Sequence, residues 1–583
     1  MNRLGMRVVF VLAGLCSSTQ ASAQVAGIVG VGPNSCNYPT VQDAIDAASP
    51  GDVVLVWGTT IFPPDTIGVT KDLYLGAGNN TCTTLTGTVT LDASGHGGRT
   101  MKVTGATTEL YTWGVSLVNG VEGEGGNLLV EDAEVHFYRG RMASGVASSR
   151  GGNAYVKDGR LDLAYEAYVE FGEAPNGGGI YVEDGDLTFF RAAIRENHAS
   201  EDGGGVYLLG DDEVATMNCG GVDAEVLLNE ADRHGGGIAG VGYVQVGTVE
   251  NPTEMLIEGN EAEEEGGGIY FAAETTPSGA PSSATFVRVK GNDAYVGGGV
   301  ASDHRAGSQT VLVQQSVIEE NTSKNGAGIF VDMIGGRDVG DSFTADNVWI
   351  MNNVAGSSGG GLYQESGRVV IEATWTDFTG PFAPVDVYPT QIVGNTADYA
   401  AGVEAYDALE MYRVYMADQV VAPSFGLYAP VDVVVHGDAH LSNVLIHSTG
   451  SGPSIRAQYG AQLDIDHLTL EAQYDPHVEY QGGTSGSLTA SIVTGDVEFG
   501  AVAYDAFCSL ITGSISYGGG GSANLAGACV GSGCDPDFTT GVFSTSELGA
   551  SSDAIGICAG FSSLSEDLVA EPRTSQDAGA LAW

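Results

Sequence analysis

Basic side chains are scarce in this chain of 583 residues: 22 Lys and Arg stand against 73 Asp and Glu, which gives a formal net charge of −51. Nucleic acids and anionic lipid surfaces bind proteins through clustered Lys and Arg that displace counterions. The sequence has no such clusters, so we expect neither partner. The hydrophobic fraction of 43% nevertheless supplies enough apolar material for a large core, which distinguishes the chain from an acidic disordered protein.

Long apolar runs are also missing. A short run from Val8 to Leu15 follows Arg3 and Arg7 and precedes the small residues Ala21-Ser22-Ala23, a pattern typical of a cleaved signal peptide. Later stretches do not reach the roughly 18 apolar residues that a membrane helix needs. We therefore expect residues 1–23 to be a signal peptide, and the mature chain to be secreted or at the cell surface, without a transmembrane segment.

Cysteine is rare and, apart from Cys219 in the middle, it lies near the two ends of the chain. Cys36 and Cys82 stand near the start, and the end contains Cys508, Cys529, Cys534 and Cys558. In an oxidising compartment, this distribution predicts one disulfide between Cys36 and Cys82 and two among the last four cysteines. The connectivity of the last four stays open.

Glycine is abundant, with 88 residues, and much of it forms a repeat. A glycine triplet followed by an apolar residue recurs at positions beginning with Gly177, Gly203, Gly235, Gly266, Gly297, Gly326 and Gly359, with weaker copies beginning at Gly125, Gly151 and Ala400. The first three steps between copies are 26 residues each, and the later ones are 29 to 41. Helical periodicity of 3.6 residues is nearly absent, which excludes an α-solenoid.

An asparagine precedes every copy from Gly203 onward by five or six residues. These asparagines are Asn197, Asn229, Asn260, Asn292, Asn321, Asn353 and Asn395. Alternating or β-branched runs before them predict strands. Asparagine tolerates the left-handed conformation of a turn, and stacked amides can hydrogen-bond along a ladder at the roughly 4.8 Å spacing of strands. Together these features predict an all-β, single-stranded right-handed parallel β-helix.

The remaining segments complete the predicted organisation. Residues 38–48 predict an amphipathic capping helix with Thr40 as N-cap, followed by a first strand over 52–56, so residues 24–56 form the N-terminal cap. The β-helix occupies residues 57–530, with glycine-rich repeats over about 125–402 and compact coils over about 430–515. Residues 531–583 form a C-terminal cap, because a bare terminal coil would expose its core and an unpaired edge.

Two parts of the sequence resemble known β-helix proteins. Residues 38–56 resemble the opening of exported bacterial members of the pectin-lyase-like β-helix superfamily, and residues 535–538 and 567–580 resemble their closing cap. The asparagine and glycine repeat is similar to that of polymorphic outer membrane proteins, whose motifs are F-x-x-N and G-G-A-[ILV]. Gly177–Ile180 matches the second motif with Gly in place of Ala, whereas Ile257–Asn260 lacks the Phe of the first. The resemblance implies the fold and leaves the activity open, because the superfamily contains lyases, hydrolases and adhesins.

The longest insertion lies in the repeat between residues 359 and 400, and it predicts a ligand-binding loop. Its candidate binding residues are Trp375, Asp377, Phe378, Phe382, Asp386 and Tyr388. Aromatic rings with nearby carboxylates are typical of sugar-binding sites, and loops of a solenoid gather on one face. The alternative is that this loop packs its aromatic residues as a local core.

Acidic loops suggest a metal. Asp202 and the run Glu263, Glu264 and Glu265 fall in the same turn of nearby repeats, where stacked carboxylates repel one another unless an ion bridges them. Calcium accepts such oxygen ligands readily, so it is the one cofactor that the sequence suggests. The alternative is a solvated acidic edge.

The leading functional hypothesis is a monomeric, non-catalytic structural or adhesive protein that binds a polysaccharide or a surface protein. The alternative, implied by the resemblance, is a polysaccharide lyase or glycoside hydrolase acting in a groove along the β-helix. A lyase needs a basic residue above carboxylates, and the nearest candidates are Arg191, Arg195 and Arg233. An arginine facing two or three carboxylates would favour the enzyme.

Overall fold

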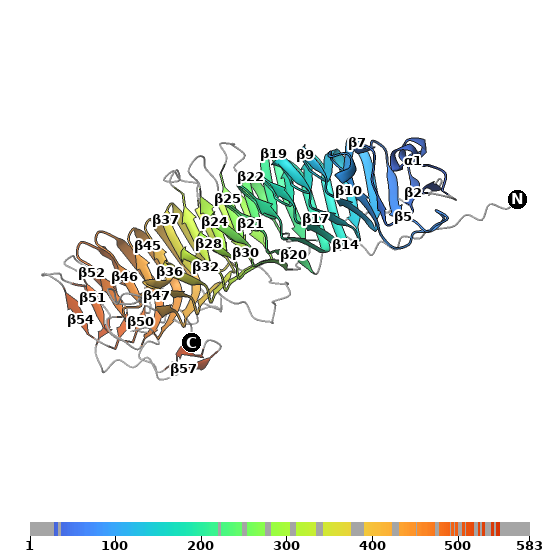
Figure 1. The fold of residues 1–583 in the computed structure, drawn as a ribbon. Helices are drawn as coiled ribbons and strands as arrows, with labels where there is room; N and C mark the ends of the chain where they lie inside the picture. Colours follow the sequence, from blue (N-terminus) through green and yellow to red (C-terminus); the bar gives the residue numbers. More distant parts are fainter. Residues whose placement is uncertain are drawn as a thin grey trace. The chain divides into compact units, whose positions relative to one another are not determined.

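The structure is a computed structural model, and it divides into two compact units, residues 1–261 (unit 1) and residues 262–583 (unit 2). The residues that it describes are 28–32, 36–219, 223–247, 254–273, 281–303, 310–333, 342–374, 390–421, 431–449, 452–472, 477–489, 491–494, 496–499, 504–507, 509–512, 514–517, 523–524, 528–530, 538–541 and 544–548. Both units are parallel β-solenoids, which confirms the predicted fold class (Figure 1).

Unit 1 consists of coils whose strands pair in parallel with those of the next coil, forming four columns. The first column follows the glycine triplets and contains β4 (Ile67–Val69), the first half of β7 (Met101–Trp113), the first half of β10 (Leu128–Tyr138), β13 (Ala154–Lys157), β16 (Ile180–Glu183), the start of β19 (Val206–Cys219) and the start of β22 (Ile238–Val246). The second contains β1 (Ile28–Val31), β2 (Asp52–Val56), β5 (Leu73–Ala77), the second halves of β7 and β10, β14 (Arg160–Glu170), β17 (Asp186–Arg195) and the ends of β19 and β22.

The other two columns of unit 1 complete each coil. The third contains β3 (Thr60–Ile61), β6 (Val89–Asp92), β8 (Val115–Val118), β11 (Arg141–Ala143), the ends of β14 and β17, β20 (Ala224–Leu227) and β23 (Met255–Glu258). The fourth contains β9 (Val121–Glu124), β12 (Val146–Arg150), β15 (Glu173–Ala174), β18 (His198–Ala199) and β21 (Glu230–Ala231).

Unit 2 repeats the same four columns. The first contains β25 (Ile269–Ala272), β29 (Val300–Asp303), β33 (Ile329–Asp332), β37 (Leu362–Ser366), β41 (Ala400–Ala405), β44 (Val431–Val435), β46 (Ile455–Ala457), β48 (Val478–Tyr480), β51 (Val497–Phe499) and β54 (Ile515–Tyr517). The second contains β26 (Ser282–Thr285), β30 (Thr310–Gln314), β34 (Ser342–Asp346), β38 (Arg368–Glu372), the first half of β42 (Ala408–Ala417), the first half of β45 (Asp438–Ser448), the first half of β47 (Gln462–Ala472), β49 (Ser485–Thr489), β52 (Tyr504–Phe507) and β55 (Ala523–Asn524).

The third and fourth columns complete the coils of unit 2. The third contains β27 (Val287–Lys290), β31 (Val317–Glu319), β35 (Trp349–Met351), β39 (Thr390–Val393), the second halves of β42, β45 and β47, β50 (Ile492–Val493), β53 (Leu510–Ile511) and β56 (Cys529–Val530). The fourth contains β28 (Asp293–Val296), β32 (Thr322–Asn325), β36 (Val354–Ser358), β40 (Thr396–Ala397) and β43 (Val420–Val421).

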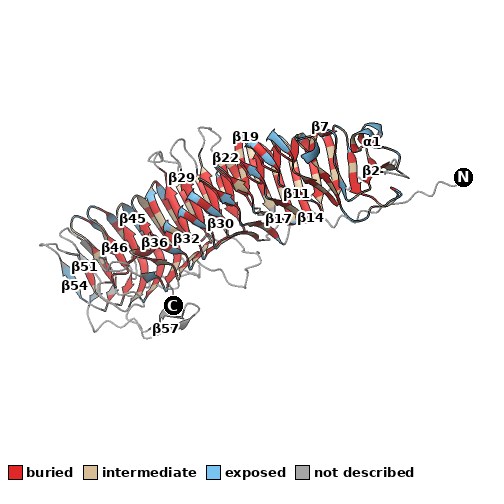
Figure 2. Ribbon diagram, in the orientation of Figure 1, coloured by how far each residue is buried: buried red, intermediate tan, exposed pale blue. Residues whose placement is uncertain are grey.

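The core of each unit follows from strand alternation, because every second side chain of a strand points inward. In unit 1, Leu110, Val135, Leu161 and Leu187 stand in register on β7, β10, β14 and β17, and all four are buried (Figure 2). Burying an aliphatic side chain of this size contributes roughly 1.5–3 kcal/mol. The residues between them point outward, so the same register that stacks the core also stacks the outer side chains.

The N-terminal helix is present as predicted. The helix α1 (Val41–Ala47) begins after Thr40, whose hydroxyl accepts a hydrogen bond from the Asp43 amide, and it buries Val41, Ala44 and Ile45. It lies against β1, β2 and β4. The predicted strand over residues 52–56 is present as β2, but the prediction that it is the first strand is wrong. Strand β1 precedes the helix in the chain and pairs with β2, and its short Gly-containing sequence has too little alternation to predict a strand.

A disulfide joins Cys36 to Cys82, as the sequence predicts, and ties the segment before α1 to the loop after β5. The side chains of Cys508, Cys529, Cys534 and Cys558 lie outside the described residues, so their pairing stays a prediction. In the region of the predicted C-terminal cap, the structure describes an antiparallel pair, β57 (Phe538–Gly541) and β58 (Ser544–Leu548).

The predicted asparagines form ladders of buried amides within each unit. In unit 1, the Asn197 side chain donates to Asn229 at 2.9 Å, and Asn229 donates to Asn260 at 3.0 Å. In unit 2, the same bonds of 2.9–3.0 Å link consecutive members of a second ladder that contains Asn292, Asn321, Asn353 and Asn395. From the second member of each ladder onward, the side-chain oxygen also accepts a hydrogen bond from the backbone N–H of the preceding asparagine. The ladder therefore satisfies buried backbone groups that the turns would otherwise leave unpaired.

The ladder of unit 1 extends further than predicted, and its first members lie in the turns that lead into the first-column strands. Asn127 and Asn153 occupy the position of the third glycine in the triplets, in register with Gly179. Their side chains continue the ladder, with Asn127 donating to Asn153 at 2.7 Å and Asn153 to Asn197 at 3.1 Å. The weaker glycine copies therefore carry the amide within the triplet itself.

The two arrangements meet in a single coil that contains no ladder asparagine. In the earlier coils, the turn position is glycine, and the Gly145 amide donates to Asn153 of its own coil. At the next turn, the Gly172 backbone amide donates to Asn197 of the following coil, and the later turns keep this pattern, with Asn197 donating to Asn229. A β-carbon at Gly179 would lie 3.0 Å from the Asn197 side chain, so the triplet must end in glycine where the turn supplies the amide.

Candidate functional site

The loop that the sequence predicts to bind a ligand spans residues 375–389, which the structure does not describe. Trp375, Asp377, Phe378, Phe382, Asp386 and Tyr388 all lie in it, so that site stays a prediction.

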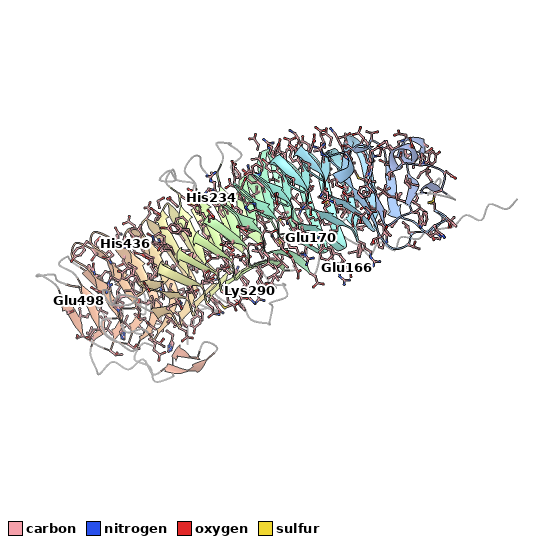
Figure 3. All side chains as sticks on the ribbon, viewed as in Figure 1. Glu166, Glu170, His234, Lys290, His436 and Glu498 are labelled. Atoms are coloured by element: carbon pink, nitrogen blue, oxygen red, sulfur yellow. A yellow bond between two sulfur atoms is a disulfide. The ribbon has the colours of Figure 1, made fainter. Side chains whose placement is uncertain are left out.

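The predicted acidic residues lie in different surroundings. Asp202 of unit 1 forms an ion pair with His234, whose Nδ1 is 2.8 Å from the carboxylate, and the side chain of His234 is almost completely buried (Figure 3). In unit 2, Glu263 and Glu264 of β24 (Glu261–Glu265) are exposed and Glu265 is buried. Calcium at these residues stays a prediction, and at Asp202 it would have to compete with a histidine.

A different set of polar side chains comes together on the outer face of the second column of unit 1. Tyr74, Tyr111, His136 and Asp162 stand in register on β5, β7, β10 and β14. On one side of this row, Glu109, Glu134 and Arg160 are in register with one another on the last three of these strands. Because adjacent parallel strands are about 4.8 Å apart, side chains in one row are in direct contact. We call Glu109, Glu134, His136 and Asp162 the histidine cluster.

His136 is the centre of the histidine cluster. Its Nδ1 lies 2.7 Å from an oxygen of Asp162, and its Nε2 lies 3.2 Å from Glu109 and 3.9 Å from Glu134. The ring stacks on Tyr111 with centroids 4.2 Å apart, and Tyr111 stacks on Tyr74 at 4.9 Å. The stacking fixes the plane of the imidazole ring, with Nδ1 facing Asp162 and Nε2 facing Glu109.

The cluster shifts the acidity of its members in opposite directions. Burial lowers the pKa of His136, but hydrogen bonds to Asp162 and Glu109 and their negative charges outweigh it, and the pKa rises to about 9. The hydrogen bond from His136 lowers the pKa of Glu109. Burial, followed by the hydrogen bond to Glu109, raises the pKa of Tyr111, whose hydroxyl therefore stays protonated and donates to that carboxylate.

Sequence reasoning missed this cluster although its signal is present. Tyr111, His136 and Asp162 are separated by 25 and 26 residues, close to the step between the first glycine copies. Applying that period to outward-facing polar residues would have placed the three side chains in one row.

Aromatic rings flank the histidine cluster on its other side. We call these rings the aromatic face: Trp113, Tyr138, Tyr165 and Phe190. Trp113, Tyr138, Ala164 and Phe190 are in register, and Tyr165 follows Ala164. Neighbouring rings meet edge to face, with interplanar angles of 82° for Trp113 and Tyr138 and 84° for Tyr138 and Tyr165. All four rings are only partly buried, so the aromatic face presents apolar area beside hydrogen-bonding groups.

Two of the three arginines weighed as lyase bases, Arg191 and Arg195, are each paired with a single carboxylate. Arg195 lies 2.9 Å from Glu170, which is buried and also binds Arg141, and Arg191 lies 3.9 Å from Asp223 (Glu170 is labelled in Figure 3). Arg233 is exposed, and its backbone amide donates to the Glu201 carbonyl. Another arginine, Arg160, has its Nε 2.7 Å from Asp162 of the histidine cluster.

Unit 2 has a histidine of its own beside a buried carboxylate. His436, labelled in Figure 3, stacks on Tyr406 with centroids 3.9 Å apart, and its Nε2 lies 2.9 Å from Glu404. The other carboxylate oxygen of Glu404 accepts a hydrogen bond from the Ser358 hydroxyl. Because Glu404 is buried and its two oxygens are both bonded, this group stabilises the coil and leaves little room for a ligand.

No protein-family model matches the sequence, and a comparison with curated proteins finds no significant relative. Among the described residues, no helix has the length and apolar character needed to cross a membrane. The class that the structure itself defines is an all-β parallel solenoid with one short N-terminal helix.

Proposed function

We propose that this chain is an exported, surface-exposed protein of the pectin-lyase-like β-helix type that binds a polysaccharide through the aromatic face of unit 1 without cleaving it. The observation that carries the proposal is the row of partly exposed rings Trp113, Tyr138 and Phe190, held in register by the strands beneath them. The opening sequence and the asparagine and glycine repeats support the superfamily and its similarity to polymorphic outer membrane proteins. The signal-like segment supports export.

The chemistry of the aromatic face suits a sugar chain. Sugars present apolar C–H faces and hydroxyl edges, and aromatic residues offer apolar area beside polar groups. The edge-to-face arrangement leaves ring surface that parallel stacking would cover. Neighbouring rings come from successive strands, with centroids 5.6–6.3 Å apart, so the face repeats along the stack as a polymeric ligand does.

The charge of the protein narrows the polysaccharide class. A net charge of −51 repels polyanions, so acidic glycans would approach the surface against an unfavourable potential. The carboxylates Glu109 and Glu134 lie across the row of Tyr111 and His136 from the rings, and they are hydrogen-bond acceptors suited to hydroxyl and ammonium groups. A neutral or amino-sugar polysaccharide is therefore the expected ligand.

The test is affinity electrophoresis and calorimetry with soluble neutral glucan, xylan, galactan and chitosan, using pectate as the acidic comparison. Trp113→Ala and Tyr138→Ala should each weaken binding at least tenfold, or about 1.4 kcal/mol. Tyr459→Ala is the matched control, because Tyr459 is a 75% exposed tyrosine of unit 2. Unchanged affinity in both face variants contradicts the proposal, and a loss in Trp375→Ala instead would favour the predicted loop.

The second candidate is a polysaccharide lyase or hydrolase, and one observation favours it. Arg160 and His136 both contact Asp162, and Glu109 and Glu134 lie beside His136, so basic groups and three carboxylates converge on one face. Incubation with the same polysaccharides should then produce unsaturated ends that absorb ultraviolet light, or new reducing ends. Products formed by the wild-type chain and lost in His136→Gln would establish the enzyme, whereas binding without products supports the binder.

A further inference from the structure

We propose that the histidine cluster is a binding site for a divalent transition-metal ion of the zinc type, with His136, Glu109 and Glu134 as its protein ligands. The nitrogen of His136 and one oxygen from each glutamate all lie within 4.8 Å of one another. This inference shares Glu109 and Glu134 with the proposed glycan site, but it rests on a separate observation, the convergence of three ligand atoms, and it needs no sugar.

The distances between the three ligand atoms suit a small ion. Zinc is bound by nitrogen and oxygen at about 2.0–2.2 Å, which places neighbouring ligand atoms of a tetrahedron roughly 3.4 Å apart. The Nε2 atom of His136 is 3.2 Å from Glu109 and 3.9 Å from Glu134, values on either side of that spacing. Small side-chain rotations would therefore bring all three onto one ion.

The imidazole is oriented as metal-binding histidines usually are. Such histidines donate their second ring nitrogen to a carboxylate, which fixes the tautomer and makes the ligating nitrogen more basic. Asp162 accepts this bond from Nδ1 of His136 at 2.7 Å, and Arg160 holds the other oxygen of Asp162 at 2.7 Å. The stacked Tyr111 ring limits rotation of the imidazole, and the Tyr111 hydroxyl donates to the ligand Glu109.

The position of the cluster also suits an ion that enters from solvent. Glu109 and Glu134 retain 43% and 57% of their side-chain exposure, whereas His136 retains 12%. The imidazole thus forms the floor of the site, and the glutamates form a rim that water can reach. Waters can complete the coordination shell of an ion at this rim.

The donor set distinguishes this ion from calcium. Calcium takes six to eight oxygen ligands, whereas imidazole with carboxylates suits zinc, cobalt and related ions. The other histidine and carboxylate group of unit 1, formed by His198, Glu230 and Asp232, has the same residue types. Its Nε2 lies 2.9 Å from Asp232, and among the described residues no carboxylate accepts a hydrogen bond from its Nδ1. We therefore place the ion at His136.

The test is zinc binding by the mature chain, measured by calorimetry and by competition with a chromogenic chelator, and cobalt binding followed by visible absorption. We expect one high-affinity ion per chain, and a cobalt spectrum with intense bands of tetrahedral or five-coordinate geometry. Glu134→Gln and His136→Gln should each lower the affinity at least tenfold, and Asp162→Asn should lower it 10- to 100-fold as a positioning residue.

Two matched variants make the assignment decisive. Glu131→Gln alters an exposed glutamate of the same strand that pairs with Lys102, and His198→Gln alters the other histidine group. Both should bind zinc like the wild type. Because Glu134 is exposed, Glu134→Gln should fold normally even if His136→Gln does not. The proposal is overturned if the wild type binds no zinc at micromolar concentration, if Glu134→Gln binds as tightly as the wild type, or if His198→Gln loses the ion instead.

Discussion

Removing one rung of the asparagine ladder tests the physical basis of the solenoid. Asn229→Ala deletes an amide that donates to Asn260 and to the Ile194 carbonyl, each at 3.0 Å. The same amide accepts hydrogen bonds from the side chain and the backbone N–H of Asn197, at 2.9 and 3.1 Å. Asn229 is buried, so water does not replace these partners.

The size of the effect follows from which groups lose all their partners. The Asn197 side chain keeps two other bonds, to the carbonyls of Val169 and Arg195. The Asn197 backbone N–H is the group left without an acceptor, whereas Ile194 lies in the part of β17 that pairs with β20. A buried polar group without a partner costs about 1–3 kcal/mol, so the free energy of opening these coils should fall by about that amount.

Native-state hydrogen exchange followed by mass spectrometry is the appropriate assay, because a repeat protein opens locally and its coils contact only their neighbours. A loss of about 1–3 kcal/mol corresponds to roughly 5-fold to 150-fold faster exchange of the amides around residues 194–205 and 226–238. Asn176→Ala is the matched control, because Asn176 makes one exposed side-chain hydrogen bond, to Glu201, and its removal should change exchange less than threefold.

The reasoning is refuted if Asn229→Ala exchanges like the control. Such a result would mean that the amide ladder merely accompanies the strand pairing and contributes no stability. A uniform acceleration over all of unit 1, in contrast, would show that the unit opens as one cooperative body, and it would leave the energy of the ladder measurable from the global opening.

Two further predictions concern titration and crosslinking. Burial raises the pKa of Asp432 to about 7, and its Oδ2 has no hydrogen-bond partner among the described residues. The folded state therefore holds this proton more tightly than the unfolded state, so the stability of unit 2 should fall by up to about 4 kcal/mol as pH rises from 4 to 8. Asp432→Asn should remove this component in denaturation curves compared across pH, and an unchanged pH profile would contradict the assignment. Reducing the Cys36–Cys82 disulfide, which closes a segment of 46 residues, should destabilise the N-terminal coils by about 4 kcal/mol. Hydrogen exchange in β1 and β2 measures this loss, Cys82→Ser should reproduce it, and equal protection in the reduced protein would contradict it.

The fold could be predicted from sequence because its repeat combines two constraints that occur together only in a solenoid. Glycine at Gly177 permits the positive φ of 66° that the turn requires, and asparagine at Asn197 fills the corner with an amide. A single repeat would be weak, but the pattern recurs through both units. In the later coils, Asn443 is in register with His467, whereas residue types alone align Asn443 with Asp466, because no glycine marks the turn.

The histidine cluster could not be recognised from residue types because it depends on register alone. His136 and Asp162 are 26 residues apart and carry no motif, and each lies in a strand that reads as an ordinary alternation of apolar and polar residues. Only pairing of β10 with β14 brings them together. The burial of His136 and the exposure of Glu109 and Glu134 also depend on the neighbouring coils, which the residue types do not reveal.

The coil with Gly172 and Gly179 imposes a rule on how this protein can be lengthened. Duplicating the segment from Asn197 to Leu228 would insert a coil that brings its own amide, so the new backbone N–H groups would all find acceptors. Duplicating the coil with Gly172 would insert a coil that has no ladder asparagine, so the buried backbone N–H of the preceding Gly172 would lose its acceptor. Gene duplication or design can therefore add coils before or after the coil with Gly172 and Gly179, but a copy of that coil itself would be destabilising.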